Sequence, residues 1–436
     1  MIHFVSIAAC YTFVFVPTTV VMGMSLQPST TPSFSSKQIL KIRIGTRPSP
    51  LAKVQTQAVA EALKKEWAGS GLLDIHADGD GDGDGDIDVQ IEIVEITTTD
   101  DQPTSKASTQ NTPLAVRSID WTGALDQALL NDEIDAAVHS LKDIPPSSRW
   151  CEGLEIACCL KREDPTDVLV VYKGMSTDSN VNVNVNVNGA LCVENLPKGA
   201  RVGTSSVRRQ AQLLSIRDDL KLINLRGNVE ARLDSLRRGE VDALIVASAG
   251  LKRLLASDDD DDDNCNGVCD MDLDWGSISS GEMLSGACQG IIGVTVRSSL
   301  DDDSCSDCGD HFSISTFDLL SRINNVDANL AATAERSFLN VLDSFRPRTH
   351  EETSREWKGR PPLAALFAKS ESQSDGGATD IWKFEGLLAR PDGSKVLRSA
   401  TTTKHAVSKD DARKIGEACA LDLLGQAGHN FYIETN

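Results

Sequence analysis

One segment of the sequence places an amine and an acid directly after a hydrophobic run. Residues 134–146 read IDAAVHSLKDIPP, which predicts a buried strand that leads into Lys142 and Asp143. Ligands of open α/β sheets bind beyond the carboxyl ends of the strands. A carboxylate and an ammonium group in such a loop can transfer protons or stabilise a developing charge. The alternative interpretation is an ion pair of little energetic weight.

A second segment places two guanidinium groups at the start of a helix. Residues 202–212 read VGTSSVRRQAQ, so we expect a short strand that ends with Thr204, Ser205 and Ser206, and then a capped helix start that carries Arg208 and Arg209. The free N–H groups of a helix start and a pair of arginines both favour anions. The sequence therefore predicts an anion site here.

A third segment repeats this arrangement. Arg226 precedes the expected N-cap Asn228, Arg232 lies one turn inside the helix, and Gly239 ends it. A single arginine pair on a surface is more often a solvated face than a binding site. Basic residues at the ends of several successive strands instead indicate a ligand with several carboxylates or phosphates, held near one acid that can transfer a proton.

The elements that must position these residues alternate between strand and helix patterns. Residues 39–44 have the two-residue period of a strand, and a helix follows with Ser49 as its N-cap and Pro50 as its first residue. Arg47 therefore lies at the carboxyl end of a strand. Further strand or helix patterns occupy residues 91–96, 124–130, 134–138, 168–171, 228–238 and 242–246. This alternation is typical of parallel α/β units.

Length and charge limit the class of protein. A chain of 436 residues with 40% apolar residues can bury two or three cores. Much of the net charge of −21 comes from aspartate-rich segments at residues 78–88, 258–263 and 301–303. We interpret these segments and the Val-Asn repeat at 181–188 as expanded surface loops. The remaining body is mildly acidic, which argues against nucleic-acid binding but permits binding of small polyanions. We also expect the chain to be a monomer.

Neither the cysteines nor the aspartate repeat predicts a metal site. The chain has 11 cysteines without the regular framework of a disulfide scaffold. Cys265, Cys269, Cys305 and Cys308 form a C-x3-C and a C-x2-C pair inside acidic loops, which leaves a zinc site as an alternative. The Asp-Gly repeat resembles part of a calcium loop but lacks the glutamate at its twelfth position. We therefore expect no bound metal.

The first 37 residues are interpreted as a targeting segment. An apolar run from Phe4 to Met24 precedes a Ser/Thr/Pro-rich stretch from Ser25 to Ser36, and no acidic residue occurs before Glu61. A signal followed by an acid-poor, hydroxyl-rich segment suits import into a plastid behind extra membranes. A secretory signal, a membrane anchor and mitochondrial targeting are the alternatives. We expect no stable membrane association after processing.

Six strings of the sequence resemble porphobilinogen deaminases, in the order of that family. They are RPSPLA (47–52), AVHSLKDIP (137–145), VGTSSVRRQ (202–210), LRGNVEARL (225–233), ASAGLKRL (247–254) and ATAERSFLNVLD (332–343). The resemblance covers residue 39 to the C-terminus, apart from the expanded loops. It implies an α/β fold with two doubly wound lobes similar to periplasmic binding proteins, followed by a small α/β C-terminal domain. We place the first lobe at residues 38–162 with 281–323, the second at 163–280 and the C-terminal domain at 324–436.

The resemblance also implies a reaction and a cofactor. The family condenses four porphobilinogens head to tail into hydroxymethylbilane with release of ammonia, in tetrapyrrole synthesis, and uses a dipyrromethane cofactor. Each porphobilinogen carries an acetate and a propionate, so polypyrrole carboxylates suit an arginine-lined cavity. Asp143 matches the catalytic acid of the family. The residues that match its binding groups are Arg47, Ser49, Lys142, Ser206, Arg208, Arg209, Arg226, Arg232 and Arg253.

Two segments depart from the pattern of the family. Residues 99–126 lack the glycines and most of the lysines of the family's lid. Residues 344–366 contain no cysteine to anchor the cofactor, and Gly359 occupies the matching position if Pro362 and Leu363 align with the turn that follows it. Cys419 lies in an expected C-terminal helix and is interpreted as a core residue. An inactive, diverged tetrapyrrole-binding protein and a binding module of the periplasmic-receptor type are therefore the alternatives to an active deaminase.

Overall fold

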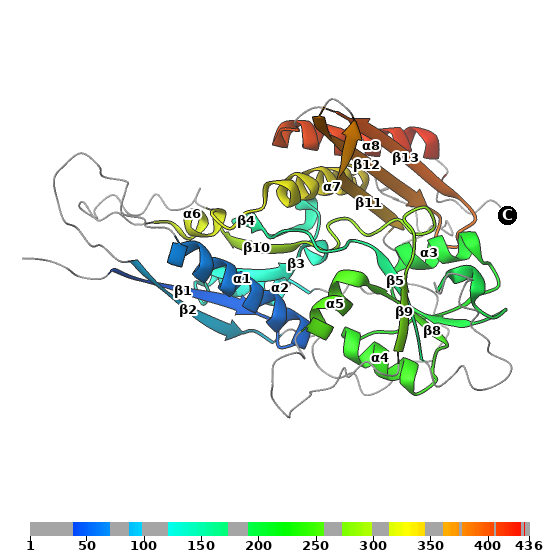
Figure 1. Cartoon of the computed structure of the whole chain (residues 1–436), viewed down its shortest axis with the longest axis horizontal. Coiled ribbons are helices and arrows are strands. Elements are labelled where there is room, and N and C mark those ends of the chain that lie inside the picture. The colour runs from blue at the N-terminus through cyan, green and yellow to red at the C-terminus, as the bar shows by residue number, and fades with distance from the viewer. Residues whose placement is uncertain are drawn as a thin grey trace, which may run out of the picture.

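The strands that the structure describes form three separate sheets, two with five strands and one with three. The computed structural model describes residues 38–69, 87–97, 121–172, 191–256, 273–298, 314–344, 361–374, 377–404, 407–428 and 431. Figure 1 shows one lobe mainly in blue and cyan, a second lobe mainly in green, and a C-terminal domain in yellow, orange and red. The expected α/β class, with two doubly wound lobes and a small third domain, is confirmed.

The first lobe is built on a sheet that begins with β1 (Gln38–Thr46). Ile42 and Ile44 are buried on one face of β1, as the two-residue period predicts. Helices α1 (Pro50–Gly69), α2 (Gly123–Leu130) and α6 (Thr316–Ser321) pack on this sheet. The strand order is β2–β1–β3–β10–β4, with β2 Ile87–Glu95, β3 Ala136–Ser140, β10 Ile292–Arg297 and β4 Leu154–Cys159.

The second lobe has a sheet of the same size. Helix α3 (Val207–Ile216) follows β6, and α4 (Val229–Arg237) and α5 (Ser248–Ala256) pack near β8. The strand order is β7–β6–β8–β5–β9, with β7 Lys221–Ile223, β6 Arg201–Gly203, β8 Ala243–Ala247, β5 Asp167–Tyr172 and β9 Leu273–Ser277.

Neither sheet is wholly parallel, which corrects the expectation of parallel units throughout. β1 pairs in parallel with β2 and β3, but β10 is antiparallel to β3 and β4. In the second lobe β6 is parallel to β7 and β8, but β5 is antiparallel to β8 and β9. The reason lies in the connections, because the chain crosses between the lobes from β4 to β5 and returns from β9 to β10.

The C-terminal domain packs two helices on the third sheet, in the order β11–β12–β13. The strands are β11 (Leu363–Ser374), β12 (Gly377–Ala389) and β13 (Val396–Thr403), and the helices are α7 (Val326–Ser344) and α8 (Lys409–Ala427). Phe338, Phe367 and Phe384 are fully buried at their interface. A Cβ at Gly416 would overlap the Ala334 carbonyl oxygen, so this glycine allows α8 to approach α7 closely.

The first crossover (residues 160–166) and the second crossover (residues 278–291) contact each other and the C-terminal domain. Glu163 N–H of the first crossover donates to the Gly290 carbonyl of the second at 3.1 Å, and Gly290 has a φ of +90°. The buried carboxylate of Glu335, on α7, accepts from Arg162 at 2.6 Å, from the Phe367 N–H at 2.7 Å and from the Cys288 N–H. All three parts of the molecule therefore meet at the crossovers.

Several sequence-based predictions fall outside the described residues. These are the targeting segment 1–37, the Asp-Gly and Val-Asn repeats, the lid up to residue 120, the four cysteines of the alternative zinc site, and Gly359. The lobe boundaries at 162/163 and 280/281 fall in the two crossovers and stay predictions. Among the described helices, none is both long and apolar enough to span a bilayer.

Candidate functional site

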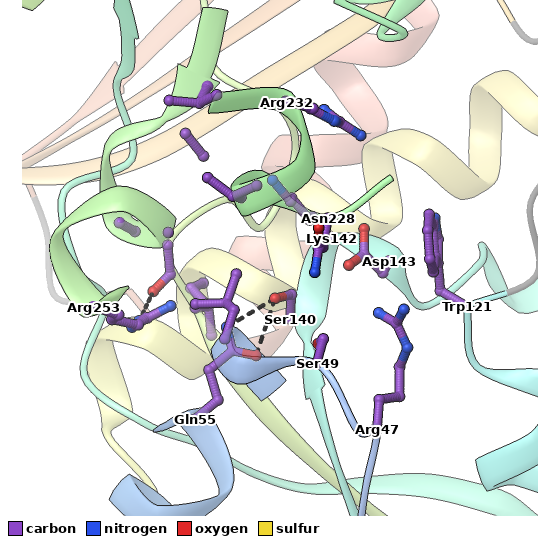
Figure 2. A pocket seen from close by; sticks show the side chains of 18 of the residues that line it. Arg47, Ser49, Gln55, Trp121, Ser140, Lys142, Asp143, Asn228, Arg232 and Arg253 are labelled. Atoms are coloured by element: carbon purple, nitrogen blue, oxygen red, sulfur yellow. Dashed lines mark hydrogen bonds between the residues drawn. The ribbon is translucent and has the colours of Figure 1, made fainter. Parts of the chain in front are cut away.

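A cavity of about 190 Å³ lies between the two lobes and is bounded by the second crossover (Figure 2). The first lobe contributes the loop after β1, the start of α1 and the loop after β3. The second lobe contributes the starts of α3, α4 and α5. Its polar lining consists of Arg47, Ser49, Gln55, Trp121, Ser140, Lys142, Asp143, Arg209, Asn228, Arg232 and Arg253.

The amine and the acid predicted from the sequence face this cavity. Strand β3 ends at Ser140, and a single 3₁₀ turn follows over Leu141–Asp143, anchored by the buried side chain of Leu141. Arg336, on α7, donates to the carbonyls of Ile144 at 3.2 Å and Pro145 at 2.9 Å. The C-terminal domain therefore fixes the backbone directly after Asp143.

Lys142 has an unusually acidic ammonium group for a lysine. The accessible surface of its side chain faces the cavity. The surrounding walls still remove enough water to lower its pKa to about 8, with Arg209 and Arg208 acting in the same direction and Asp143 and Asp167 opposing them. The Lys142 ammonium donates to the Oε1 of Gln289 at 3.4 Å. At neutral pH this side chain is therefore a cation that can lose its proton at mildly alkaline pH.

Arg47 reaches the cavity from the carboxyl end of β1, as predicted. Its guanidinium group lies 4.3 Å from the ring centroid of Trp121, which also lines the cavity. Ser49 is the expected N-cap of α1, because its Oγ accepts from the Ala52 N–H at 3.4 Å. Sequence reasoning missed Trp121, although a tryptophan just before the helical pattern of residues 124–130 was the available signal.

Arg232 reaches the cavity from the other lobe. Asn228 caps α4 by accepting from the Ala231 N–H at 3.0 Å, as expected. The Nε of Arg232 donates to the Gly227 carbonyl at 3.0 Å. Burial lowers the pKa of Arg232 to about 10, with a further contribution from Arg209. Arg232 is therefore protonated at neutral pH but poorly hydrated, which favours a carboxylate partner.

The paired arginines of α3 are placed differently. The helix start is capped as predicted, and the cap is Ser206, which accepts from the Arg209 N–H at 3.5 Å. Both side chains are buried and bind Asp167, with Arg208 Nη1 and Arg209 Nη2 each 2.7 Å from a carboxylate oxygen. Arg208 also donates to the Leu284 carbonyl and Arg209 to that of Ile245, at 2.7 and 2.8 Å.

The environment of Asp167 keeps it ionised. Burial alone would raise the pKa of its carboxyl, but Arg208 and Arg209 outweigh burial and hold the pKa below its usual range. Arg209 lines the cavity, whereas Arg208 and Ser206 lie outside its wall. The two arginines of α3 therefore already bind a carboxylate of the protein itself, that of Asp167.

The remaining predicted residues are divided between the wall and the surface. Arg253 lines the cavity, and its Nη2 donates to the Gly290 carbonyl at 2.7 Å. Arg226 is exposed and lies outside the wall. Gln55 and Ser140, which sequence reasoning did not select, join the wall through a 2.8 Å hydrogen bond from Gln55 Nε2 to Ser140 Oγ. Ser140 belongs to a string already singled out and Gln55 lies in the helix predicted after Ser49, but only the packing of α1 on β3 brings them together.

The cavity fits the part of a dipyrromethane site that binds the carboxylates of the cofactor without a covalent bond. Arg47, Lys142, Arg232 and Arg253 supply cations from both lobes for the carboxylates of a pyrrole ligand. Cys288, which the sequence analysis did not weigh, also lines the cavity, but its side chain is buried and burial raises the pKa of its thiol far above the usual range. Such a thiol is a poor nucleophile at neutral pH. The described residues of the cavity wall thus offer cations for carboxylates, and the thiol among them, that of Cys288, is a poor nucleophile.

Comparison with known proteins identifies the family. A family model described as "Porphobilinogen deaminase, dipyromethane cofactor binding domain" matches residues 42–306. The chloroplastic porphobilinogen deaminase of Oryza sativa subsp. japonica is 33% identical over 397 residues, covering 90% of this chain and 85% of that protein. The porphobilinogen deaminase of Geobacter sulfurreducens is 30% identical over 396 residues, covering 90% and 94%.

Among solved structures, an ancestral arginine-binding protein bound to arginine covers 65% of this chain and 89% of its own, with 15% identity and a TM-score of 0.31. The family assignment does not depend on this likeness. It follows from a family model that matches more than half of the chain and from relatives that match along nearly all of it. The chain belongs to the porphobilinogen deaminase family.

Proposed function

We propose that this chain is a hydroxymethylbilane synthase, a transferase that condenses four porphobilinogens head to tail and releases ammonia. The observation that carries the proposal is the cavity between the lobes, where Asp143 and Lys142 share a space with Arg47, Arg232 and Arg253. Porphobilinogen carries two carboxylates and an aminomethyl group. A cavity with several cations and one acid matches these charges.

The cations would bind and orient the substrate. Arg47 belongs to the first lobe, whereas Arg232 and Arg253 belong to the second, so the acetate and the propionate of one ring can be held from opposite sides. A charge-assisted hydrogen bond contributes about 1.5 to 3 kcal/mol. Two such contacts fix the ring, and with it the position of the aminomethyl group relative to Asp143.

Asp143 would act at the pyrrole nitrogen. Loss of ammonia breaks the C–N bond of the protonated aminomethyl group and leaves a positive charge that the ring nitrogen shares. A carboxylate beside that nitrogen stabilises the developing charge. The new C–C bond forms at the unsubstituted α-carbon of a second pyrrole, and the proton that this carbon loses passes to the Asp143 carboxylate. The step is balanced without any further reactant.

The dipyrromethane cofactor, when bound, supplies the first free pyrrole α-carbon. We propose that the arginines and Lys142 hold it through its carboxylates alone, because Gly359 stands at the position that matches the family's anchoring cysteine. Held in this way, the cofactor is exchangeable and leaves the chain on denaturation. A diverged, inactive tetrapyrrole-binding protein is the second candidate, and the same missing cysteine favours it.

Turnover and intact mass test these proposals together. With porphobilinogen as substrate, Asp143→Ala should lower the rate of bilane formation by about 100-fold or more without a lower melting temperature. Asp234→Ala, which removes an exposed acid of α4, is the matched control and should keep the wild-type rate. Wild-type turnover in Asp143→Ala would remove Asp143 from the mechanism.

Intact-mass measurement separates the candidates further. The purified chain should show no added dipyrromethane, and any synthesis should be slow because the cofactor is not retained. A covalent adduct would contradict retention by carboxylate contacts alone and would direct the search to Cys288, Cys419 or another thiol. A wild-type chain that binds bilane but consumes no porphobilinogen would support the inactive, tetrapyrrole-binding alternative.

We also propose import into a plastid and action as a monomer. The relatives from Oryza sativa and Pisum sativum are both named chloroplastic, which supports the plastid. Both lobes of one chain line the cavity, which supports action as a monomer. A fluorescent protein fused behind residues 1–37 should enter the plastid. Retention in the secretory pathway or entry into mitochondria would favour the other interpretations of this segment.

A further inference from the structure

Gln289 lies in the second crossover, behind the cavity wall, and its side chain touches both lobes. The residue is 1% exposed. Its Oε1 accepts from the Lys142 ammonium at 3.4 Å. Its Nε2 donates to Asp167 Oδ1 at 2.9 Å and to the Pro165 and Thr166 carbonyls at 2.8 and 3.3 Å. One carboxamide therefore joins the loop of Lys142 to the first crossover and to the carboxylate that binds the α3 arginines.

The chemistry of the partners fixes the orientation of this amide. An ammonium group can only donate hydrogen bonds, and an ionised carboxylate or a carbonyl can only accept them. The oxygen of Gln289 must therefore face Lys142, and its nitrogen must face Asp167. A flipped amide would place N–H against an ammonium and oxygen against a carboxylate. The backbone is fixed as well, because Arg162 Nε donates to the Gln289 carbonyl at 2.9 Å.

The charged groups near Lys142 cannot replace this contact. Asp143 is its chain neighbour and belongs to the proposed chemistry, while Asp167 is engaged by Arg208 and Arg209. Loss of water is the main effect that disfavours the ammonium form of Lys142, and these two arginines add to it by repulsion. Gln289 is neutral, so its oxygen accepts from the ammonium without adding a negative charge. A negative charge here would repel the carboxylates of the ligand. A neutral side chain that has both an acceptor and a donor, such as an amide, therefore suits this position.

We propose that Gln289 is a positioning residue that holds the Lys142 ammonium at the cavity and couples its placement to the Asp167–Arg209 pair of the second lobe. The proposal rests on the proposed function, which assigns Lys142 to carboxylate binding. Gln289 itself is not among the residues that line the cavity. Its effect is exerted through the proton affinity and the position of Lys142.

Gln289→Met tests the proposal, because methionine has a similar size and lacks both polar atoms. The first readout is the pKa of Lys142, obtained by competitive acetylation of its amine from about pH 6 to about pH 10 and peptide mass spectrometry. Loss of the oxygen should lower this pKa by about 1, since a hydrogen bond to a charged group is lost. The second readout is KM for porphobilinogen, which should rise by roughly tenfold with a smaller change in kcat.

Gln212→Met is the matched control. Gln212 is also 1% exposed, and its amide binds the N–H and the carbonyl of Leu284 in the same crossover, at 2.8 and 3.1 Å, away from Lys142. Its loss should reduce stability but leave the acetylation profile of Lys142 unchanged. If Gln289→Met does not fold, Gln289→Asn keeps a polar group in the crossover while withdrawing the oxygen from Lys142, and should lower the pKa of Lys142 in the same direction.

The outcomes separate this inference from the proposed function. An acetylation profile that is the same in the folded Gln289 variant and the wild type overturns the inference, whatever the activity. A shifted profile with an unchanged KM supports the positioning of Lys142 by Gln289 but contradicts a role for Lys142 in substrate binding. A shift of equal size in Gln212→Met would show a general effect of a loosened crossover and would also overturn the inference.

Discussion

Two helix starts in the second lobe carry arginines in their first turn, yet only one offers a guanidinium group without an ion pair. Arg208 and Arg209, on α3, share the buried Asp167, and each also donates to one backbone carbonyl. Arg232, on α4, binds the Gly227 carbonyl through Nε, and within the described residues it forms no ion pair. The same local pattern, arginines at a capped helix start, therefore leads to buried ion pairs in α3 and to a guanidinium group that lines the cavity in α4.

The difference teaches what turns an arginine into a ligand-binding group. A buried guanidinium group that already has a carboxylate has little to gain from another, because its desolvation is compensated within the protein. A guanidinium group that faces a cavity and has lost water without gaining a carboxylate is ready for one from a ligand. We therefore expect α3 to support the lobe and α4 to bind substrate.

Removal of the internal carboxylate is the strongest test of this comparison. Asp167→Asn leaves two buried guanidinium groups without a charged partner, which should lower the free energy of unfolding by about 3 to 5 kcal/mol. Denaturant unfolding measures the loss. Asp242→Asn, which breaks the more exposed pair with Arg201, should cause a much smaller loss. Equal losses in the two variants would show that Asp167 is not the main partner of the α3 arginines.

Substitution of the arginines themselves sharpens the comparison. Arg232→Met should weaken porphobilinogen binding about 10-fold or more, because a charge-assisted contact is lost, with little change in melting temperature. Arg208→Met should lower the melting temperature instead. Calorimetric titration and thermal unfolding of both variants measure the two effects. A binding defect in Arg208→Lys at unchanged stability would restore the original prediction that Arg208 binds ligand, and the comparison would fail.

The sequence predicted the parts of this site that depend on local structure. Ser49 and Asn228 were correctly assigned as N-caps, and a capped start was predicted for α3, because a capping residue, a turn and a helical period are all visible within a few positions. The strand-end position of Asp143 followed from the apolar run before it in the same way.

Tertiary partners escaped this reasoning. Asp167 pairs with arginines 41 and 42 residues away, and Gln289 reaches Lys142 across 147 residues, so no local period could reveal either contact. The antiparallel direction of β10 depends on the return crossover and not on the residues of the strand. The carboxylate partner Asp167 distinguishes the buried Arg209 from Arg232, which lines the cavity and forms no ion pair within the described residues, and that partner is visible only in the fold.

The smallest expected effect is a pH dependence that separates Lys142 from the arginines. Lys142 has a pKa of about 8, whereas Arg232, with a pKa of about 10, stays protonated over the range tested. Because the pKa of Lys142 is lowered, its ammonium form is present below about pH 8 and is lost as the pH rises through that value. The Kd for porphobilinogen, measured by calorimetry, should therefore rise several-fold from about pH 7 to about pH 9.

Lys142→Met shows whether this slope belongs to Lys142. The variant should bind porphobilinogen more weakly at pH 7 but with a nearly constant Kd up to about pH 9, since the arginines that remain keep their protons. A variant that retains the full wild-type slope would place the titrating group elsewhere, either on another residue or on the aminomethyl group of the ligand. In that case the arginines alone would account for carboxylate binding. The contrast between cations that support the fold and cations that bind substrate would then concern only the arginines.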